Sequence, residues 1–235
     1  MLKYLTLLLF LATFLTSCSK NNPVSPGASA WIDPKAGSSF TFDNYSTDTT
    51  TGLPVPGTRD TTVDTFLQSG ISYMGKTNVS EIVQVGKFTR DTVYLNYESN
   101  GDISEFIPSG NGSLKWFTIP SGSKTTSTAL IANDTTTYGS IIYSTKVTET
   151  FSYVDDETMS IKGQSVSVTK LQASIISSLT TTPPGTTTTS TSASFGYFSP
   201  TLGYITKSED LISTDPTTGT KSQGHLMLLI DYTEK

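Results

Sequence analysis

The sequence predicts a single all-β domain, an antiparallel sheet that forms a curved half-barrel (clamshell-like) or a sandwich. The first observation is composition: the 235 residues include 42 Thr and 33 Ser. Both are poor helix-interior residues, and β-branched Thr favours strands. The second observation is patterning, because runs of alternating apolar and polar residues are separated by turn signals and no long helical period occurs.

Charge and composition exclude several classes of function. The formal net charge is −5, and the 15 basic side chains are scattered singly, so a nucleic-acid partner is not expected. With 35% hydrophobic residues, the chain can build one sizeable core. Because it has one cysteine, it has no intrachain disulfide, and stability has to come from that core.

Residues 1–17 have the features of a signal peptide. Lys3 supplies a positive start, and an apolar run follows from Tyr4 to Leu15. As a helix this run would span about 18 Å, well short of the ~30 Å hydrocarbon core of a bilayer. It therefore fits a cleaved leader rather than a membrane span.

The tetrad Leu15-Thr16-Ser17-Cys18 resembles the lipobox of bacterial lipoproteins, with an aliphatic residue and two small residues before a cysteine. The resemblance implies cleavage between Ser17 and Cys18, a diacylglycerol thioether on Cys18, and acylation of the new N-terminus, for example by palmitate. Such a protein is anchored to the membrane through lipid. The alternative is an ordinary secretory signal with an incidental cysteine.

The residues after Cys18 indicate a location in the bacterial cell envelope. Ser19 stands where an inner-membrane retention signal of the enterobacterial type has Asp, which favours the outer membrane. Residues 19–22 lack the acidic surface-export signal of Bacteroidota lipoproteins, which favours a periplasm-facing protein. Residues 18–37, rich in Pro and Gly, predict a flexible tether that first docks at Trp31-Ile32. The β domain follows over residues 38–235.

A hairpin around Asn100-Gly101 is the best-defined local element. Two alternating runs, 91–98 and 102–107, flank this pair. Asn-Gly between such runs is the strongest short-range hairpin signal, because both central positions of a type I′ turn need positive φ.

The longest predicted strand covers residues 138–154. One face is apolar and aromatic, and the other carries mostly hydroxyl groups, as in an antiparallel sheet with one wet face. Asp155-Asp156 is then expected to turn the chain, and a phase shift near Lys170 predicts a bulge or bend. The low-complexity stretch 180–194 is expected to be a Thr-rich loop. Its alternative is a long ribbon of paired strands.

A second resemblance concerns the segment Tyr197-Phe-Ser-Pro-Thr-Leu-Gly-Tyr-Ile-Thr-Lys-Ser-Glu209. It is similar to an aromatic–x–Ser/Ala–Pro–x–x–Gly–apolar segment near the end of small envelope lipoproteins of unknown function. Those proteins resemble the half-barrel carriers of lipoprotein trafficking, so the resemblance implies a curved antiparallel sheet around an apolar hollow.

Residues with catalytic chemistry are few. His225 is the only histidine and has no cysteine or second histidine to complete a triad or a zinc site. The candidate carboxylates Asp155, Asp156, Glu157, Glu209 and Asp210 fit solvated turns better than a hydrolase pair. Calcium at residues 155–157 lacks the spacing of a ligand loop. We therefore predict no enzyme, no cofactor and no metal, and a hydrolase would require two carboxylates facing each other in a cleft.

Four Asp-Thr pairs resemble the O-glycosylation sequon of Bacteroidota, and ordinary Asx-turn chemistry is the alternative. Their threonines are Thr49, Thr61, Thr92 and Thr135.

Two functional hypotheses follow from these features. The first is an envelope protein that shelters an apolar ligand, such as a lipid or acyl chain, against the aromatic face of 138–154. The second is a structural or adhesive envelope component with a polar and glycosylated surface. The sequence carries no signal for an oligomeric state.

Overall fold

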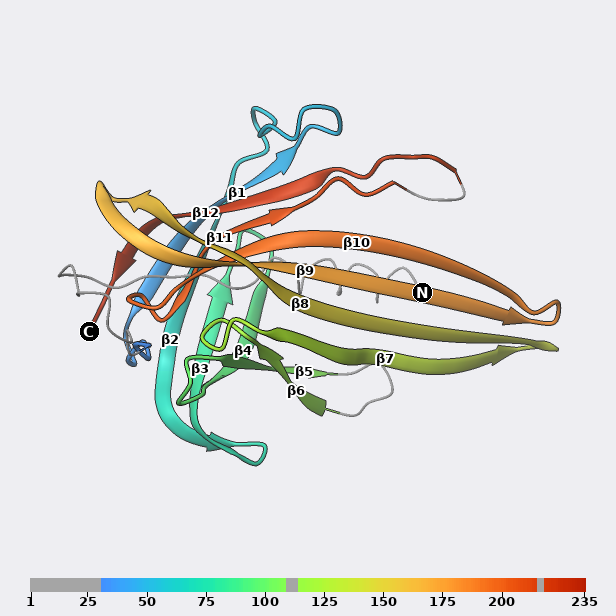
Figure 1. The fold of residues 1–235 in the computed structure, drawn as a ribbon, viewed down its shortest axis with the longest axis horizontal. Helices are drawn as coiled ribbons and strands as arrows, with labels where there is room; N and C mark the ends of the chain where they lie inside the picture. Colours follow the sequence, from blue (N-terminus) through green and yellow to red (C-terminus); the bar gives the residue numbers. More distant parts are fainter. Residues whose placement is uncertain (1–30, 109–113, 215–217) are drawn as a thin grey trace.

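The computed structural model describes residues 31–108, 114–214 and 218–235. Within these ranges every regular element is a β-strand (Figure 1), and no helix has the length and apolar character needed to cross a bilayer. Residues 1–30, including the tetrad Leu15-Thr16-Ser17-Cys18 that resembles a lipobox, lie outside the described part. The strands are β1 (Ser39–Thr47), β2 (Asp60–Tyr73), β3 (Lys76–Val85), β4 (Arg90–Tyr97), β5 (Ile103–Pro108), β6 (Leu114–Ile119), β7 (Thr126–Tyr138), β8 (Ile141–Ile161), β9 (Gln164–Thr182), β10 (Thr186–Ser199), β11 (Tyr204–Asp210) and β12 (Gly224–Thr233).

All strands belong to one antiparallel sheet in the order β6-β5-β4-β3-β2-β1-β12-β11-β10-β9-β8-β7. The chain steps outward from β1 to the edge strand β6, crosses to the opposite edge at β7, and steps back until β12 pairs with β1. The sheet curls so far that its two edges nearly meet. The predicted single antiparallel β domain is confirmed: it is one curved 12-stranded sheet and not a sandwich, and it is closer to a closed barrel than the predicted half-barrel.

Aromatic side chains fill the concave inside of the curled sheet, and we call this closed part of the sheet the curl. Phe40, Phe66 and Tyr204 are fully buried. The Phe66 ring centroid lies 5.4 Å from that of Phe40 and 5.3 Å from that of Tyr204, both edge-on, an arrangement that aromatic quadrupoles favour. Burial of each such side chain stabilises the fold by about 1.5–3 kcal/mol.

The predicted hairpin joins β4 to β5, but its turn is longer than predicted. Tyr97 pairs with Ile103, and only Gly101 in the connection has positive φ, so the type I′ assignment is wrong. Asn100 instead caps the turn, with its side chain bonded to Asp102. Trp31 packs against this turn, since a Cβ added to Gly101 would lie 2.0 Å from Trp31 Cδ1.

The segment before β1 docks at Trp31-Ile32, as the sequence predicts. Besides the contact of Trp31, the Ile32 N–H donates a hydrogen bond to the Pro200 carbonyl at 3.1 Å. The backbone of Ile32 also approaches Gly203 so closely that a Cβ there would lie 1.6 Å from the Ile32 oxygen. Glycine at 203 is therefore needed both for its positive φ and for this contact.

The turn predicted at Asp155-Asp156 is wrong, because β8 continues to Ile161 and the chain turns at Lys162-Gly163. The acidic residues stay in the strand with basic partners: Asp156 pairs with Lys124, and Glu157 with Lys170 at 2.8 Å. The predicted irregularity near Lys170 is confirmed. It is a bulge in which β8 has an extra residue opposite the step from Leu171 to Lys170.

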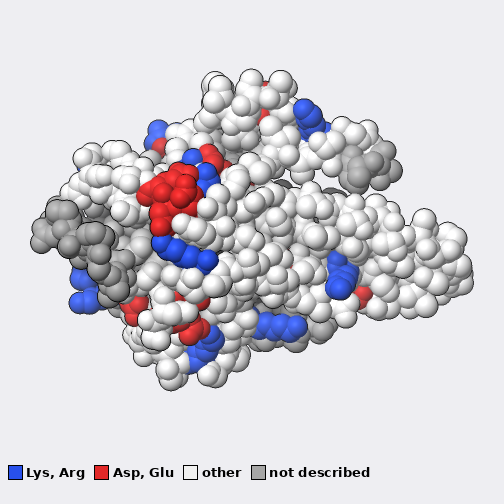
Figure 2. Space-filling view, viewed as in Figure 1, with Lys and Arg blue, Asp and Glu red and all other residues white. Residues whose placement is uncertain are grey.

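The Thr-rich loop predicted at 180–194 is also wrong, and the alternative ribbon forms. Most of these residues belong to β9 and β10, where β-branched threonines pair across the strands: Thr180 Oγ1 lies 2.9 Å from Thr187 Oγ1. Together the outer parts of four strands project from the curl (Figure 1). We call this part the ribbon: residues 132–138, 141–148, 175–182 and 186–193. Figure 2 shows that the ribbon carries few charged side chains on the face in view.

Candidate ligand-binding site

A small pocket lies inside the curl, between β5 and β6 on one side and β8 to β11 on the other. Its volume is about 20 Å³, which is room for about one water molecule. Most of its lining is apolar, with two carboxyl groups and two hydroxyl groups. The lining residues are Glu105, Ile107, Phe117, Glu149, Phe151, Ala173, Ser194, Phe195, Gly196, Phe198, Ile205 and Ser208.

Strand alternation directs both carboxyl groups into this pocket. Residues at i and i+2 of a strand share a face, and Glu105 lies between the buried Ile103 and Ile107 on β5. On β8, Glu149 likewise stands between two buried apolar residues. As a result, each glutamate is only 6% exposed.

The two glutamates have no hydrogen-bond or ion-pair partner within the described residues. Burial, with a smaller contribution from the neighbouring charge of Glu149, raises the pKa of Glu105 to about 8. Burial raises the pKa of Glu149 to about 7. At neutral pH Glu105 is therefore mostly protonated, and the pocket holds less negative charge than its two acids suggest.

The pocket lies at the seam between the two edges of the sheet. β6 and β7 are the terminal strands of the sheet, and no ladder joins them among the described residues. Side chains close the gap instead: the Phe117 ring of β6 packs 5.1 Å from the Phe151 ring of β8. Since the lining comes from both sides of the seam, separating these two rings would open the pocket.

A second buried polar group lies among the core aromatics. Gln84 Nε2 donates to Asp64 Oδ2 at 3.3 Å, and Tyr204 Oη donates to the same oxygen at 3.5 Å. Burial raises the pKa of Tyr204, and the charges of Asp64, Tyr97 and Glu105 add to that effect. The interior of the curl is therefore acidic beyond the pocket itself.

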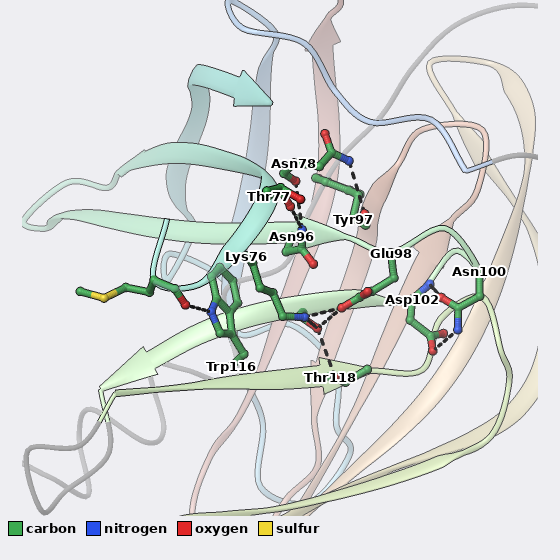
Figure 3. A network of polar contacts seen from close by, with 12 residues as sticks. Lys76, Thr77, Asn78, Asn96, Tyr97, Glu98, Asn100, Asp102, Trp116 and Thr118 are labelled. Carbon is green, nitrogen blue, oxygen red and sulfur yellow. Dashed lines mark hydrogen bonds and ion pairs between the residues drawn. The ribbon is translucent and has the colours of Figure 1, made fainter. Parts of the chain in front are cut away.

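A polar network supports β5 from its outer face (Figure 3). Lys76 forms an ion pair with Glu98 and donates a hydrogen bond to Ser104 Oγ at 2.9 Å. Ser104 also contacts Thr118 of β6 at 3.1 Å. The ammonium of Lys76 lowers the pKa of Glu98. Because Ser104 precedes Glu105, this network fixes the strand that carries the buried carboxyl.

The carboxylates singled out from the sequence do not form a facing pair. Glu209 accepts a hydrogen bond from Tyr197 at 2.9 Å, while Asp210 faces the other side of β11 and pairs across the strands with His225. Burial raises the pKa of Asp210 to about 7 and lowers that of His225. Asp210 Oδ1 and His225 Nδ1 are buried without a hydrogen-bond partner. Among the residues described, no cluster of three or more potential metal ligands occurs.

The threonines of the sequon-like pairs lie at the surface. Thr49 is half-exposed in the turn after β1, and three others are exposed on strands: Thr61, Thr92 and Thr135. Asp48 accepts hydrogen bonds from the N–H groups of Thr50 and Thr51 at 3.0 and 2.8 Å, the Asx-turn chemistry of the alternative interpretation. Ser17 and Cys18 lie outside the described residues.

Sequence reasoning missed the two pocket glutamates, although a signal was present. Each interrupts an inward row of apolar residues, as in Ile-Ser-Glu-Phe-Ile at 103–107. A carboxyl at such a position is buried if the strand register holds, whereas the acidic pairs chosen from the sequence were selected only for being adjacent.

Comparison with known proteins identifies the fold. A candidate lipoprotein from Parabacteroides distasonis aligns with a TM-score of 0.53 and 10% identity over 88% of this chain and 100% of its own. The chain shares the fold of that protein. A candidate exported protein with a YmcC-like fold from Bacteroides fragilis aligns at 0.47 with 13% identity, covering 87% of this chain and 100% of its own. No protein-family profile and no curated protein matches the sequence.

Proposed function

We propose that this chain is a lipid-anchored protein of the bacterial cell envelope that binds an apolar ligand, such as a lipid or acyl chain, inside its curled sheet. The observation that carries the binding role is the mostly apolar pocket at the seam. A side-chain seam can open without breaking backbone hydrogen bonds, and apolar pockets with a few polar groups are typical of ligand sites.

Binding is favoured over hydrolysis by the mostly apolar lining of the pocket. Glu105 and Glu149 are two carboxyl groups on one cavity, as a glycosidase requires. The rest of the lining, however, is mostly apolar and offers few partners for the hydroxyl groups of a sugar ring, which lose their hydrogen bonds to water when they are buried. We therefore assign the glutamates to ligand recognition and propose no catalytic role.

A fluorescent acyl probe tests the binding role. The full chain with Cys18→Ser, which cannot be acylated, should enhance the fluorescence of the probe in a saturable way. Ala173→Leu fills the pocket and should weaken that binding, while Tyr138→Ala, at an 80% exposed position on the ribbon, should leave it unchanged. Absence of saturable binding to the Cys18→Ser chain would argue against the ligand-binding role.

The anchor and the location rest on the resemblance of Leu15-Thr16-Ser17-Cys18 to a lipobox and agree with the fold shared with a candidate lipoprotein. We propose attachment at Cys18 to the outer membrane, facing the periplasm. Labelling with alkyne-palmitate in a bacterial host should mark the wild-type chain and not Cys18→Ser. Membrane fractionation and protease shaving of intact cells then test the membrane and the face.

A structural or adhesive role is the second candidate, and the surface positions of Thr49, Thr61, Thr92 and Thr135 favour it. Glycans at these threonines would raise the intact mass of the chain purified from a native host and would be lost in Thr→Val variants. Retention on peptidoglycan or polysaccharide columns tests adhesion itself. An unmodified mass and no retention would remove this candidate.

A further inference from the structure

Two buried acidic side chains face the same pocket without a partner in the described part of the chain. Glu105 and Glu149 are both more than nine-tenths buried, and neither has a hydrogen bond or ion pair with any described residue. Buried polar groups are normally satisfied, so an unsatisfied pair lining a cavity points to a partner that comes from outside. Of the residues that the structure describes, no lysine or arginine lines the pocket.

We propose that the pocket binds the ammonium head of an amphiphile, whose apolar tail passes between Phe117 and Phe151 at the seam. This inference rests on the proposed ligand-binding function and specifies the class of ligand. A primary ammonium has three N–H donors and one positive charge. It can therefore donate hydrogen bonds to both carboxyl groups, and its charge favours their ionised forms.

The pocket discriminates against other head groups. A carboxylate or phosphate head would place a negative charge beside Glu105 and Glu149, with Asp64 and Tyr204 farther inside the same acidic core. A neutral alcohol would leave at least one carboxyl group without a charged partner. The cavity of about 20 Å³ matches a head about the size of one water molecule, and aromatic faces at the seam favour a cation.

Three water-soluble probes with the same tail separate these cases: hexylamine, hexan-1-ol and hexanoate. Each is titrated into the full Cys18→Ser chain at pH 7 by isothermal calorimetry. We expect hexylamine to bind about tenfold or more tighter than hexan-1-ol, as charge-assisted hydrogen bonds are the stronger ones, and hexanoate to bind most weakly. Repeating the titration in buffers of different ionisation enthalpy should show proton release with hexylamine only.

Glu105→Gln keeps the shape of the side chain but cannot ionise when an ammonium group binds. This variant should lose most of the preference for hexylamine over hexan-1-ol and release fewer protons. The matched control is Glu157→Gln, on the same strand as Glu149 but paired with Lys170 outside the pocket. It should retain both the preference and the proton release.

The outcomes separate the ligand-binding function from the inference about the head group. If no probe binds and the acyl probe also fails, the ligand-binding function itself is wrong. If hexan-1-ol or hexanoate binds at least as tightly as hexylamine, the head-group inference is wrong and the binding function stands. Equal loss of hexylamine binding in Glu105→Gln and Glu157→Gln would show only general attraction to an acidic protein, and would also overturn the inference.

Discussion

The curl and the ribbon belong to the same sheet, but different interactions hold them. In the curl, alternate side chains face inward, and Phe40, Phe66 and Tyr204 are fully buried. In the ribbon, every residue from 186 to 191 is exposed, and cross-strand hydroxyl contacts such as Ser178–Thr189 replace a core. The difference teaches that threonine can extend a sheet beyond its core, while the free energy of folding comes mainly from the curl.

The pocket is an exception within the curl. Around it, two carboxyl groups take positions where the strand pattern calls for apolar side chains. Burying such groups opposes folding at any pH where they ionise in the unfolded chain. The curl therefore combines most of the buried apolar residues of the molecule with two buried acids, whereas the ribbon has a single buried core residue, Val147, at its base among the described side chains.

Truncation of a core aromatic residue should produce the largest effect. Phe66→Ala removes a fully buried ring that contacts both Phe40 and Tyr204, and should lower the free energy of unfolding by about 3–5 kcal/mol. The control is Phe88→Ala, at a position 87% exposed, where we expect a change within about 0.5 kcal/mol. Urea unfolding followed by tryptophan fluorescence measures both. Similar losses in the two variants would contradict the conclusion that the buried side chains of the curl supply most of the free energy of folding.

Replacing the buried Glu105 by glutamine should stabilise the protein at neutral and basic pH, but not at acidic pH. Glu105 has a pKa of about 8 in the folded state against 4.5 as its ordinary value. Between these values the unfolded chain releases a proton that the folded chain keeps, so stability falls as pH rises through this window. Glu105→Gln should therefore raise the free energy of unfolding by about 1–4 kcal/mol at pH 8 and by almost nothing at pH 4.

Thermal unfolding of wild type and Glu105→Gln across pH 4–9 measures this difference. The control variant Glu157→Gln removes a half-exposed carboxylate and should show no comparable pH-dependent gain, since exposed ion pairs contribute little. If both variants raise the midpoint of thermal unfolding by the same amount at every pH, the stabilisation does not arise from the ionisation of the buried Glu105.

The sequence predicted those elements whose signal lies in a few neighbouring residues. The all-β class, the Asn100-Gly101 hairpin, the docking of Trp31 and the bulge opposite Lys170 all follow from residues close in sequence. The turn at Asp155-Asp156 failed for a non-local reason. Lys124, in the connection between β6 and β7, pairs with Asp156, and Lys170, on β9, pairs with Glu157, so these acids can remain in β8.

The pocket could not be predicted because it depends on the closure of the sheet. Glu105 and Glu149 are 44 positions apart, and they line one cavity only because the edges β6 and β7 approach each other. No sequence pattern indicates how far a sheet curls. The sequence could indicate each glutamate separately, as an acid in an apolar row, but not that the two share a site.

The smallest effect should come from the ribbon and should separate the hydroxyl group from the branched shape of threonine. Thr187 contacts Thr180 across the β9–β10 hairpin at 2.9 Å. Thr187→Ala removes both the hydroxyl and the branch and should cost about 0.2–1 kcal/mol; Thr187→Val keeps the branch and should cost less. Hydrogen exchange of ribbon amides should rise in Thr187→Ala while that of amides in the curl stays unchanged, because local opening of the ribbon does not require the core to unfold. A loss of more than about 2 kcal/mol, or faster exchange throughout the curl, would show that the two regions fold as one cooperative unit.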